Sequence, residues 1–182
     1  TPSSAASDVY KRQVFGFKKF RPGQLEIIDA VACGENVLAI MPTGGGKSLC
    51  FQLPALLNDG LTVVISPLIA LMRDQVRGLK AAGVIAGAIT SANTQEEVDQ
   101  VFSQIISGDL KLLYLAPERL VSRKIQNVLS NANVTSIAVD EAHCVSQWGH
   151  DFRPDYLAIG ELRRTLRAVS YTHLTLPTKV YV

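Results

Sequence analysis

The most informative stretch of the sequence is Val37-Leu-Ala-Ile-Met-Pro-Thr-Gly-Gly-Gly-Lys-Ser48. Its first four residues, Val37–Ile40, are apolar and predict a short buried strand, and a glycine-rich loop follows at once. Three consecutive glycines let the backbone curl and turn its N–H groups inward, where they can bind phosphate. Lys47 supplies a mobile positive charge for the β- and γ-phosphates, and the Ser48 hydroxyl can ligate Mg²⁺.

This phosphate loop departs from the full pattern G-x-x-x-x-G-K-[ST] at one place, because Met41 stands where the pattern has glycine. The Gly-Lys-Ser end is intact. The alternative interpretation is a glycine-rich turn with a solvated lysine, and the order strand, loop, helix argues against it. We expect the nucleotide to be bound by Thr43, Gly44, Gly45, Gly46, Lys47 and Ser48.

Short apolar runs alternate with amphipathic stretches on both sides of this loop. Further strands are predicted at residues 62–66, 84–89, 112–115 and 136–140. Helices are predicted from Pro22 to Gly34, over 68–82, from the capping box Thr94-Gln-Glu-Glu97 to Gly108, and near 119–129. This alternation predicts an α/β fold with a parallel sheet covered by helices on both faces. Ligands of such sheets bind outside the carboxyl ends of the strands.

An acidic pair follows the last of these predicted strands, in Ile137-Ala-Val-Asp-Glu-Ala-His143. Asp140 can hold Mg²⁺ through water while Glu141 polarises the attacking water. Alone, such a pair is more often a helix cap. Because a phosphate loop lies upstream, we favour the catalytic interpretation.

Composition limits the class of protein. The 182 residues are 47% hydrophobic and 19% charged, which fits one globular domain or part of a larger one. We find no apolar run long enough for a membrane span and no secretory leader. The three cysteines are widely spaced, so a disulfide framework or zinc site is not expected, and a reducing cytosol fits better. Cys50 and Cys144 are interpreted as small buried residues rather than nucleophiles.

The two ends of the chain, residues 1–13 and 169–182, do not resemble the rest. Asp8-Val-Tyr-Lys-Arg-Gln13 fits the DNA GAT GTG TAT AAG AGA CAG, and the reverse complement of that DNA, in another register, gives Val169-Ser-Tyr-Thr-His-Leu174. The DNA resembles a transposon-type sequencing adaptor. We therefore expect a domain at 14–168, cut on both sides. The formal net charge is +2 and each end carries +1, so the middle is neutral and the charge does not indicate nucleic-acid binding.

Together the motifs resemble RecQ DNA helicases, within the superfamily named for Asp-Glu-x-His boxes. The matching segments are residues 15–24, 41–48, 66–75, 114–119 and 140–154, in family order. The resemblance implies an incomplete RecA-like first domain of an ATP-dependent 3′–5′ DNA helicase that acts in recombination and repair. It implies ATP and Mg²⁺ as cofactors, single-stranded and duplex DNA as partners, a second RecA-like domain elsewhere, and a bacterial cytoplasmic, nucleoid-associated location without a membrane.

The resemblance also assigns roles to residues. Phe17 matches the aromatic that stacks on adenine, Arg21 the adjacent cation and Gln24 the amide that reads adenine by donating and accepting at once. The alternative for Phe17 is packing of an entry segment. Lys47 and Glu141 are the expected catalytic residues, and Ser48 and Asp140 the expected metal ligands.

Contact with DNA is expected at two segments. Ser66, at a strand end, matches a DNA-backbone motif, with a plain strand-to-helix turn as the alternative. The second segment, 146–154, resembles the aromatic-rich loop that couples DNA contact to hydrolysis. Trp148 and Phe152 are expected to stack on bases, and Arg153 is expected to pair with phosphate. His143 and Gln147 are expected to connect the DNA site with the nucleotide site, and His150 belongs to the same DNA-binding or coupling segment. The alternative for Trp148 is a buried core anchor.

Three other readings of the function stay open at this point. One is an RNA helicase or RNA-remodelling ATPase, and another is a nucleotide-dependent binding module without motor activity. The third is an unfolded truncation product. Under the helicase interpretation, we expect this chain to bind ATP weakly, to hydrolyse it poorly and not to unwind DNA.

Overall fold

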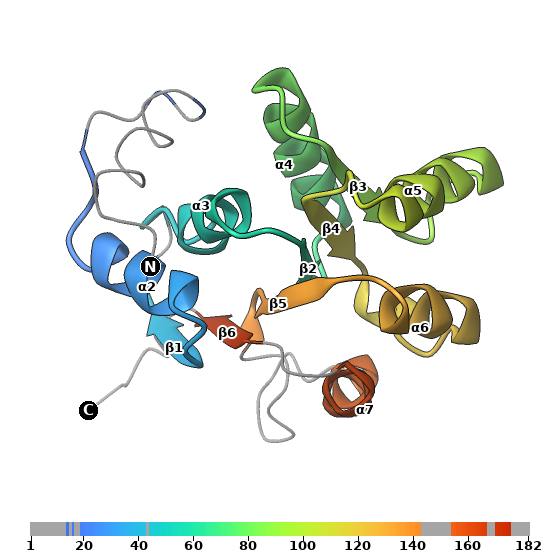
Figure 1. The fold of residues 1–182 in the computed structure, drawn as a ribbon. Helices are drawn as coiled ribbons and strands as arrows, with labels where there is room; N and C mark the ends of the chain where they lie inside the picture. Colours follow the sequence, from blue (N-terminus) through green and yellow to red (C-terminus); the bar gives the residue numbers. More distant parts are fainter. Residues whose placement is uncertain are drawn as a thin grey trace.

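The computed structural model describes residues 14, 16, 19–42, 44–142, 154–166 and 170–175. Among them, six strands form one sheet in the order β1-β6-β5-β2-β4-β3, and every neighbouring pair is parallel (Figure 1). The strands are β1 Val37–Ile40, β2 Leu61–Ile65, β3 Ala86–Ile89, β4 Leu112–Leu115, β5 Val134–Val139 and β6 Ser170–Thr175. The helices are α2 Gln24–Ala32, α3 Leu49–Leu57, α4 Ile69–Ala81, α5 Gln95–Ser107, α6 Arg123–Ser130 and α7 Ala158–Thr165.

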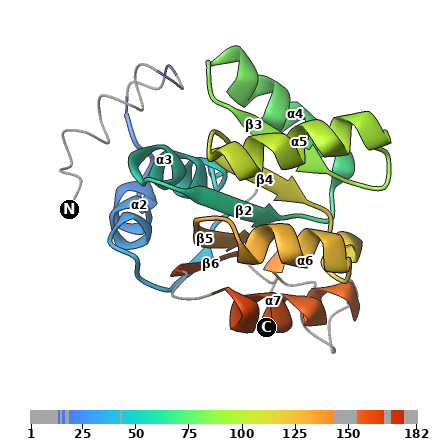
Figure 2. The same ribbon diagram turned by 45° about the vertical axis from the view of Figure 1, so that its right-hand side comes forward.

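Helices cover both faces of the sheet, with α2, α3 and α4 on one side and α5, α6 and α7 on the other (Figures 1 and 2). Strand β2 shows why. Its neighbouring side chains point to opposite faces, so Val63 and Ile65 pack with α5, α6 and α7, whereas Val64 packs with α3 and α4. All three are fully buried. The predicted α/β class, a parallel sheet between two helical layers, is confirmed.

Most predicted elements form within two residues of their expected bounds, and the differences have local causes. Helix α2 begins at Gln24 rather than Pro22, because Gly23 occupies the N-cap position with a left-handed φ of 80°. Strand β3 begins at Ala86 rather than residue 84. The predicted helix near 119–129 is divided into a short 3-10 turn, Pro117–Arg119, and α6. The capping box at the start of α5 is present, and Gly108 ends that helix with a φ of 79°.

Strand β6 is the one element that the sequence analysis left outside the domain. Residues Ser170–Thr175 pair with β1 on one side and with β5 on the other. Three of these six residues, Tyr171, Thr172 and Thr175, are of types that favour extended backbone. The sheet therefore extends beyond residue 168. The adaptor origin of the segment stays a prediction.

Two further properties of the described residues bear on function. None of the helices described is both long and apolar enough to cross a bilayer. Cys50 is fully buried, and burial raises the pKa of its thiol to about 12, so it does not form a thiolate near neutral pH. The interpretation of Cys50 as a small buried residue is confirmed, whereas Cys144 lies outside the described residues.

Candidate nucleotide-binding site

The parallel sheet brings the predicted site residues to one edge. The phosphate loop follows the carboxyl end of β1, Ser66 follows β2, and Asp140 follows β5. Strand β6 lies between β1 and β5, so the loop and Asp140 are two strand spacings apart, roughly 10 Å. That spacing leaves room between them for phosphate groups.

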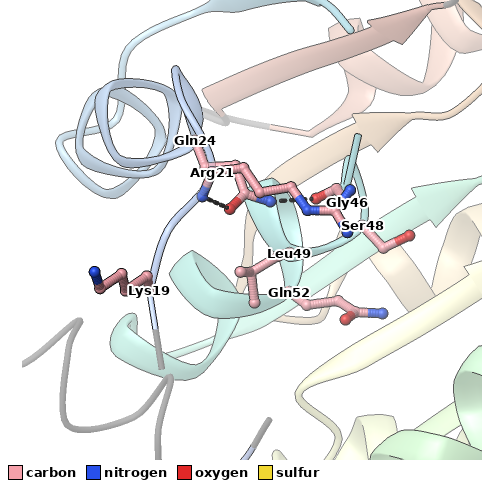
Figure 3. A pocket seen from close by; sticks show the side chains of 7 residues that line it. All are labelled: Lys19, Arg21, Gln24, Gly46, Ser48, Leu49 and Gln52. Atoms are coloured by element: carbon pink, nitrogen blue, oxygen red, sulfur yellow. Dashed lines mark hydrogen bonds between the residues drawn. The ribbon is translucent and has the colours of Figure 1, made fainter. Parts of the chain in front are cut away.

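Gln24 is joined to the phosphate loop by its side chain. Its Nε2 donates to the carbonyl oxygen of Gly46 at 3.0 Å, and its Oε1 accepts from the backbone N–H of Arg21 at 2.7 Å (Figure 3). The same Nε2 donates to the carbonyl oxygen of Gly45 at 3.4 Å. The Arg21 guanidinium donates to the carbonyl of Gly44. Gln24 is only 3% exposed, so its amide is held in place by these bonds. The first turn of α2 therefore holds the loop from one side.

Gly46 is required where it stands. Its φ is +80°, which favours glycine, and a Cβ built there would lie 2.4 Å from Nε2 of Gln24. The glycine lets the backbone approach the amide closely. A glycine at position 46 is thus what allows the Gln24 side chain to lie against the loop.

A cavity of about 250 Å³ opens beside this junction. Figure 3 shows Arg21 and Gln24 reaching from the start of α2 toward Gly46, with Ser48 and Gln52 nearby and Lys19 apart from them. The lining residues are Lys19, Arg21, Gln24, Gly46, Ser48, Leu49 and Gln52. Four of them, Arg21, Gln24, Gly46 and Ser48, were predicted to bind the base or the phosphates. The lining includes two cations, two amides and a hydroxyl, which suits a polar anionic ligand.

Asp140 is a buried carboxylate at the opposite side of the site, 7% exposed. Its Oδ2 accepts from the Ser66 hydroxyl at 3.3 Å and its Oδ1 from the backbone N–H of Glu141 at 3.0 Å. Burial raises the pKa of Asp140, and the neighbouring Glu141 charge raises it further, while those two hydrogen bonds and the Lys47 charge lower it. Burial is the largest influence, so the charged form of Asp140 is disfavoured in the metal-free chain, and a cation bound beside it would stabilise that form.

Glu141 turns the chain sharply after β5, with a left-handed φ of 51°. Such a conformation costs a residue other than glycine roughly 1–2 kcal/mol. The turn follows the strand end directly, and the Glu141 charge is near enough to raise the pKa of Asp140.

The donor set fits Mg²⁺. Asp140 offers carboxylate oxygens and Ser48 a hydroxyl, and Mg²⁺ prefers few protein oxygens supplemented by substrate phosphates and water. The described residues contain no group of three or more His, Cys, Asp or Glu side chains that could hold a metal by themselves.

Ser66 lies differently from its expected DNA-facing role. It is 2% exposed, and its hydroxyl donates to Asp140 while also accepting weakly from the backbone N–H of Leu68 at 3.5 Å. Its side chain thus orients a candidate metal ligand. A role in contacting DNA stays a prediction.

Several predicted site residues lie outside the described residues and stay predictions: Phe17, Thr43, His143, Gln147, Trp148, His150, Phe152 and Arg153. Conversely, the structure shows polar residues near the loop that the sequence analysis did not single out. Gln52 and Gln75 lie next to Ser48 and Tyr114 in one hydrogen-bonded row. The sequence signals were the polar position of Gln52 within the apolar run of α3 and the place of Gln75 at the end of the matched segment 66–75, whose expected role was contact with DNA.

Comparison with known proteins places this site in context. The model of the DEAD/DEAH box helicase family matches residues 21–176. A RecQ ATP-dependent DNA helicase of Haemophilus influenzae is 52% identical over 152 residues, which cover 84% of this chain and 25% of the relative. ATP-dependent DNA helicase Q1 of Rattus norvegicus is 45% identical over 171 residues, 90% of this chain and 28% of the relative. The chain therefore spans about a quarter of the length of these curated relatives.

Solved structures share the fold at lower identity. The crystal structure of the DUF1998 helicase MrfA bound to DNA superposes with a TM-score of 0.76 at 17% identity, over 95% of this chain and 26% of that one. At such identity the likeness concerns the fold alone, which is that of RecA-like helicase domains. The motif-based resemblance to RecQ helicases is confirmed by the sequence relatives.

Proposed function

Because the chain belongs to the DEAD/DEAH box helicase family, we propose that it is the nucleotide-binding part of an ATP-dependent DNA helicase of the RecQ type. One observation carries the proposal. The Gln24 amide is bonded to the carbonyls of the phosphate loop, at the same sheet edge as the buried carboxylate of Asp140. In the proposed site Gln24 would read the base, the loop would bind the phosphates and Asp140 would bind the metal, which is the order in which ATP presents these groups.

The roles of the residues follow from their chemistry. Lys47 and the loop N–H groups bind the phosphates, Ser48 and Asp140 hold Mg²⁺, and Glu141 orients the attacking water. When bound, Mg²⁺ would neutralise part of the negative charge of the nucleotide phosphates. Phe17 and Arg21 complete the adenine site around Gln24, whose amide can both donate and accept.

Unwinding requires more than this chain. We propose that a second RecA-like domain of the longer protein closes over the nucleotide and supplies an arginine finger, worth about 10³–10⁵ in rate in related phosphoryl-transfer enzymes. The longer protein would move 3′–5′ on single-stranded DNA, act in recombination and repair, and work in the bacterial cytoplasm at the nucleoid. The segment 146–154, with Trp148 and Phe152, would couple DNA contact to hydrolysis.

The test is an unwinding assay with the full-length gene product and with the 182-residue chain. We expect the full-length product to unwind duplex DNA carrying a 3′ overhang and not a 5′ overhang, and the short chain to unwind neither. Hydrolysis by the full-length product should be stimulated more by single-stranded DNA than by RNA of the same sequence. Stronger stimulation by RNA would favour the RNA-remodelling alternative, and unwinding by the short chain would contradict the need for a second domain.

A further inference from the structure

The Ser48 hydroxyl has a partner on a distant part of the chain. Its Oγ accepts a hydrogen bond of 3.0 Å from Nε2 of Gln75, in the middle of α4. Gln75 Oε1 in turn accepts from Nε2 of Gln52 at 3.4 Å, and the same Nε2 donates to the Tyr114 hydroxyl at 2.8 Å. A hydrogen-bonded row therefore runs from the phosphate loop through α4 and α3 to β4.

Burial fixes the orientation of this row. Tyr114 is 1% exposed and Gln52 is buried, so each needs its hydrogen bond, because an unsatisfied polar group there is costly. With the Gln75 carbonyl oxygen committed to Gln52, its amide N–H is the group that faces Ser48. The bond to Ser48 is thus a donation into the serine oxygen.

That donation determines what the serine can offer a ligand. A serine oxygen has two lone pairs and one proton. Gln75 occupies one lone pair, which leaves the other for a cation. The bond also restricts rotation of the Ser48 side chain, so less rotational freedom is lost when a metal binds.

Helix α4 is connected to both candidate metal ligands. Ser66, just before its start, donates to Asp140, and Gln75, about two turns into the helix, donates to Ser48. The same helix carries Arg73 on its exposed side, bonded to the carbonyl of Ala92. Both candidate metal ligands, Asp140 and Ser48, are therefore hydrogen-bonded to α4 or to the turn just before it.

We propose that Gln75 is a positioning residue for the metal–nucleotide site, which holds the Ser48 hydroxyl ready to ligate Mg²⁺. This inference rests on the proposed function, because the role has meaning only if Ser48 binds the metal of a bound nucleotide. It predicts an effect on metal-dependent nucleotide binding and none on binding without metal.

The test is a double-mutant cycle on the 182-residue chain, with ATP affinity measured by calorimetry in Mg²⁺ and in EDTA. The four proteins are the unsubstituted chain, Gln75→Met, Ser48→Ala and the double variant. Methionine keeps the length and helix preference of glutamine and removes the N–H. We expect Gln75→Met to weaken Mg²⁺–ATP binding about 5- to 10-fold, the value of one hydrogen bond, and to change binding in EDTA by less than about twofold.

The cycle separates positioning from general support of the fold. If Gln75 acts through the Ser48 oxygen, Gln75→Met has no further effect in the Ser48→Ala background. An equal loss in both backgrounds, or an equal loss with and without metal, would overturn the inference. Gln100→Leu, an exposed glutamine on α5, is the matched control and should bind as the unsubstituted chain does. If Gln75→Met does not fold, Gln75→Leu takes its place in the same cycle.

Failure of the proposed function would give a different binding result from failure of the role of Gln75. If the folded, unsubstituted chain binds no ATP in Mg²⁺, the nucleotide site itself is wrong and the inference falls with it. If the unsubstituted chain shows Mg²⁺-dependent binding and Gln75→Met is unchanged, only the role of Gln75 is overturned.

Discussion

At the scale of single residues, two glycines with nearly the same backbone angle differ in their surroundings. Gly46 has a φ of +80° and a potential Cβ 2.4 Å from Gln24, whereas Gly34 has a φ of +82° and nothing within 4 Å. We predict that both substitutions to alanine lower stability by roughly 1–2 kcal/mol through backbone strain. Only Gly46→Ala should also weaken ATP binding, by about tenfold or more, because it displaces the Gln24 amide. Thermal melts and calorimetry measure both effects, and equal ATP affinities would contradict the account.

Asp140 gives a second residue-scale prediction, on pH. Burial raises its pKa in the folded chain, so its ionisation opposes folding. The stability associated with protonated Asp140 is fully present below the pKa of aspartate in the unfolded chain, about 3.9, and is lost as the pH rises through the pKa of Asp140 in the folded chain. We predict that Asp140→Asn stabilises the metal-free chain at pH 7 and loses that advantage near pH 4, while weakening Mg²⁺–ATP binding. Urea unfolding across this range tests it, with the exposed Asp59→Asn as control. A pH-independent gain would contradict it.

At the scale of elements, the start of α5 allows a matched test of capping. Thr94 accepts from the backbone N–H of Glu97, and Glu97 accepts from that of Thr94, whereas Ser122 at the start of α6 makes no such bond. We predict that Thr94→Ala costs about 1 kcal/mol and that Ser122→Ala is close to neutral. The hydrogen bond from the Thr94 N–H also lowers the pKa of Glu97. The stabilisation that the Glu97 carboxylate gives the helix should therefore be present above the ordinary pKa of glutamate and fade as the pH falls through the pKa of Glu97 in the folded chain. Equal urea midpoints for the two variants would refute this difference.

The elements also show what the sequence could and could not predict. Val37–Ile40 and Leu112–Leu115 were predicted at their observed bounds from their continuous apolar runs. Leu112–Leu115 is buried throughout, whereas Leu38 and Ile40 of the edge strand β1 are 66% and 61% exposed, so the prediction that β1 is buried was wrong. The phosphate loop and Asp140 were predicted because strand order brings carboxyl ends together. The Ser48–Gln75 bond was not predictable, since it joins residues 27 positions apart through the packing of α4 beside α3. The inward-facing Ser66 hydroxyl was missed for the same reason: its partner, Asp140, is 74 positions away.

At the scale of the whole molecule, β6 holds the sheet together. It pairs with β1, which leads into the phosphate loop, and with β5, which leads into Asp140. A chain ending at residue 168 would leave the facing edges of β1 and β5 unpaired, and open edges promote association. We predict that this truncation lowers the melting temperature, promotes aggregation and abolishes ATP binding. A monomeric truncated chain with unchanged melting would show that β6 is dispensable.

We expect this chain to form an adenine-specific, metal-dependent phosphate site. The most direct measurement is calorimetric binding of Mg²⁺–ATP and Mg²⁺–GTP to the 182-residue chain and to its Lys47→Ala, Gln24→Ala and Lys80→Ala variants. We predict that ATP binds at least about tenfold more tightly than GTP, that Lys47→Ala loses binding and that Lys80→Ala keeps it. Gln24→Ala should erase the preference for adenine. A folded chain that binds both nucleotides equally, or neither, would contradict the claim.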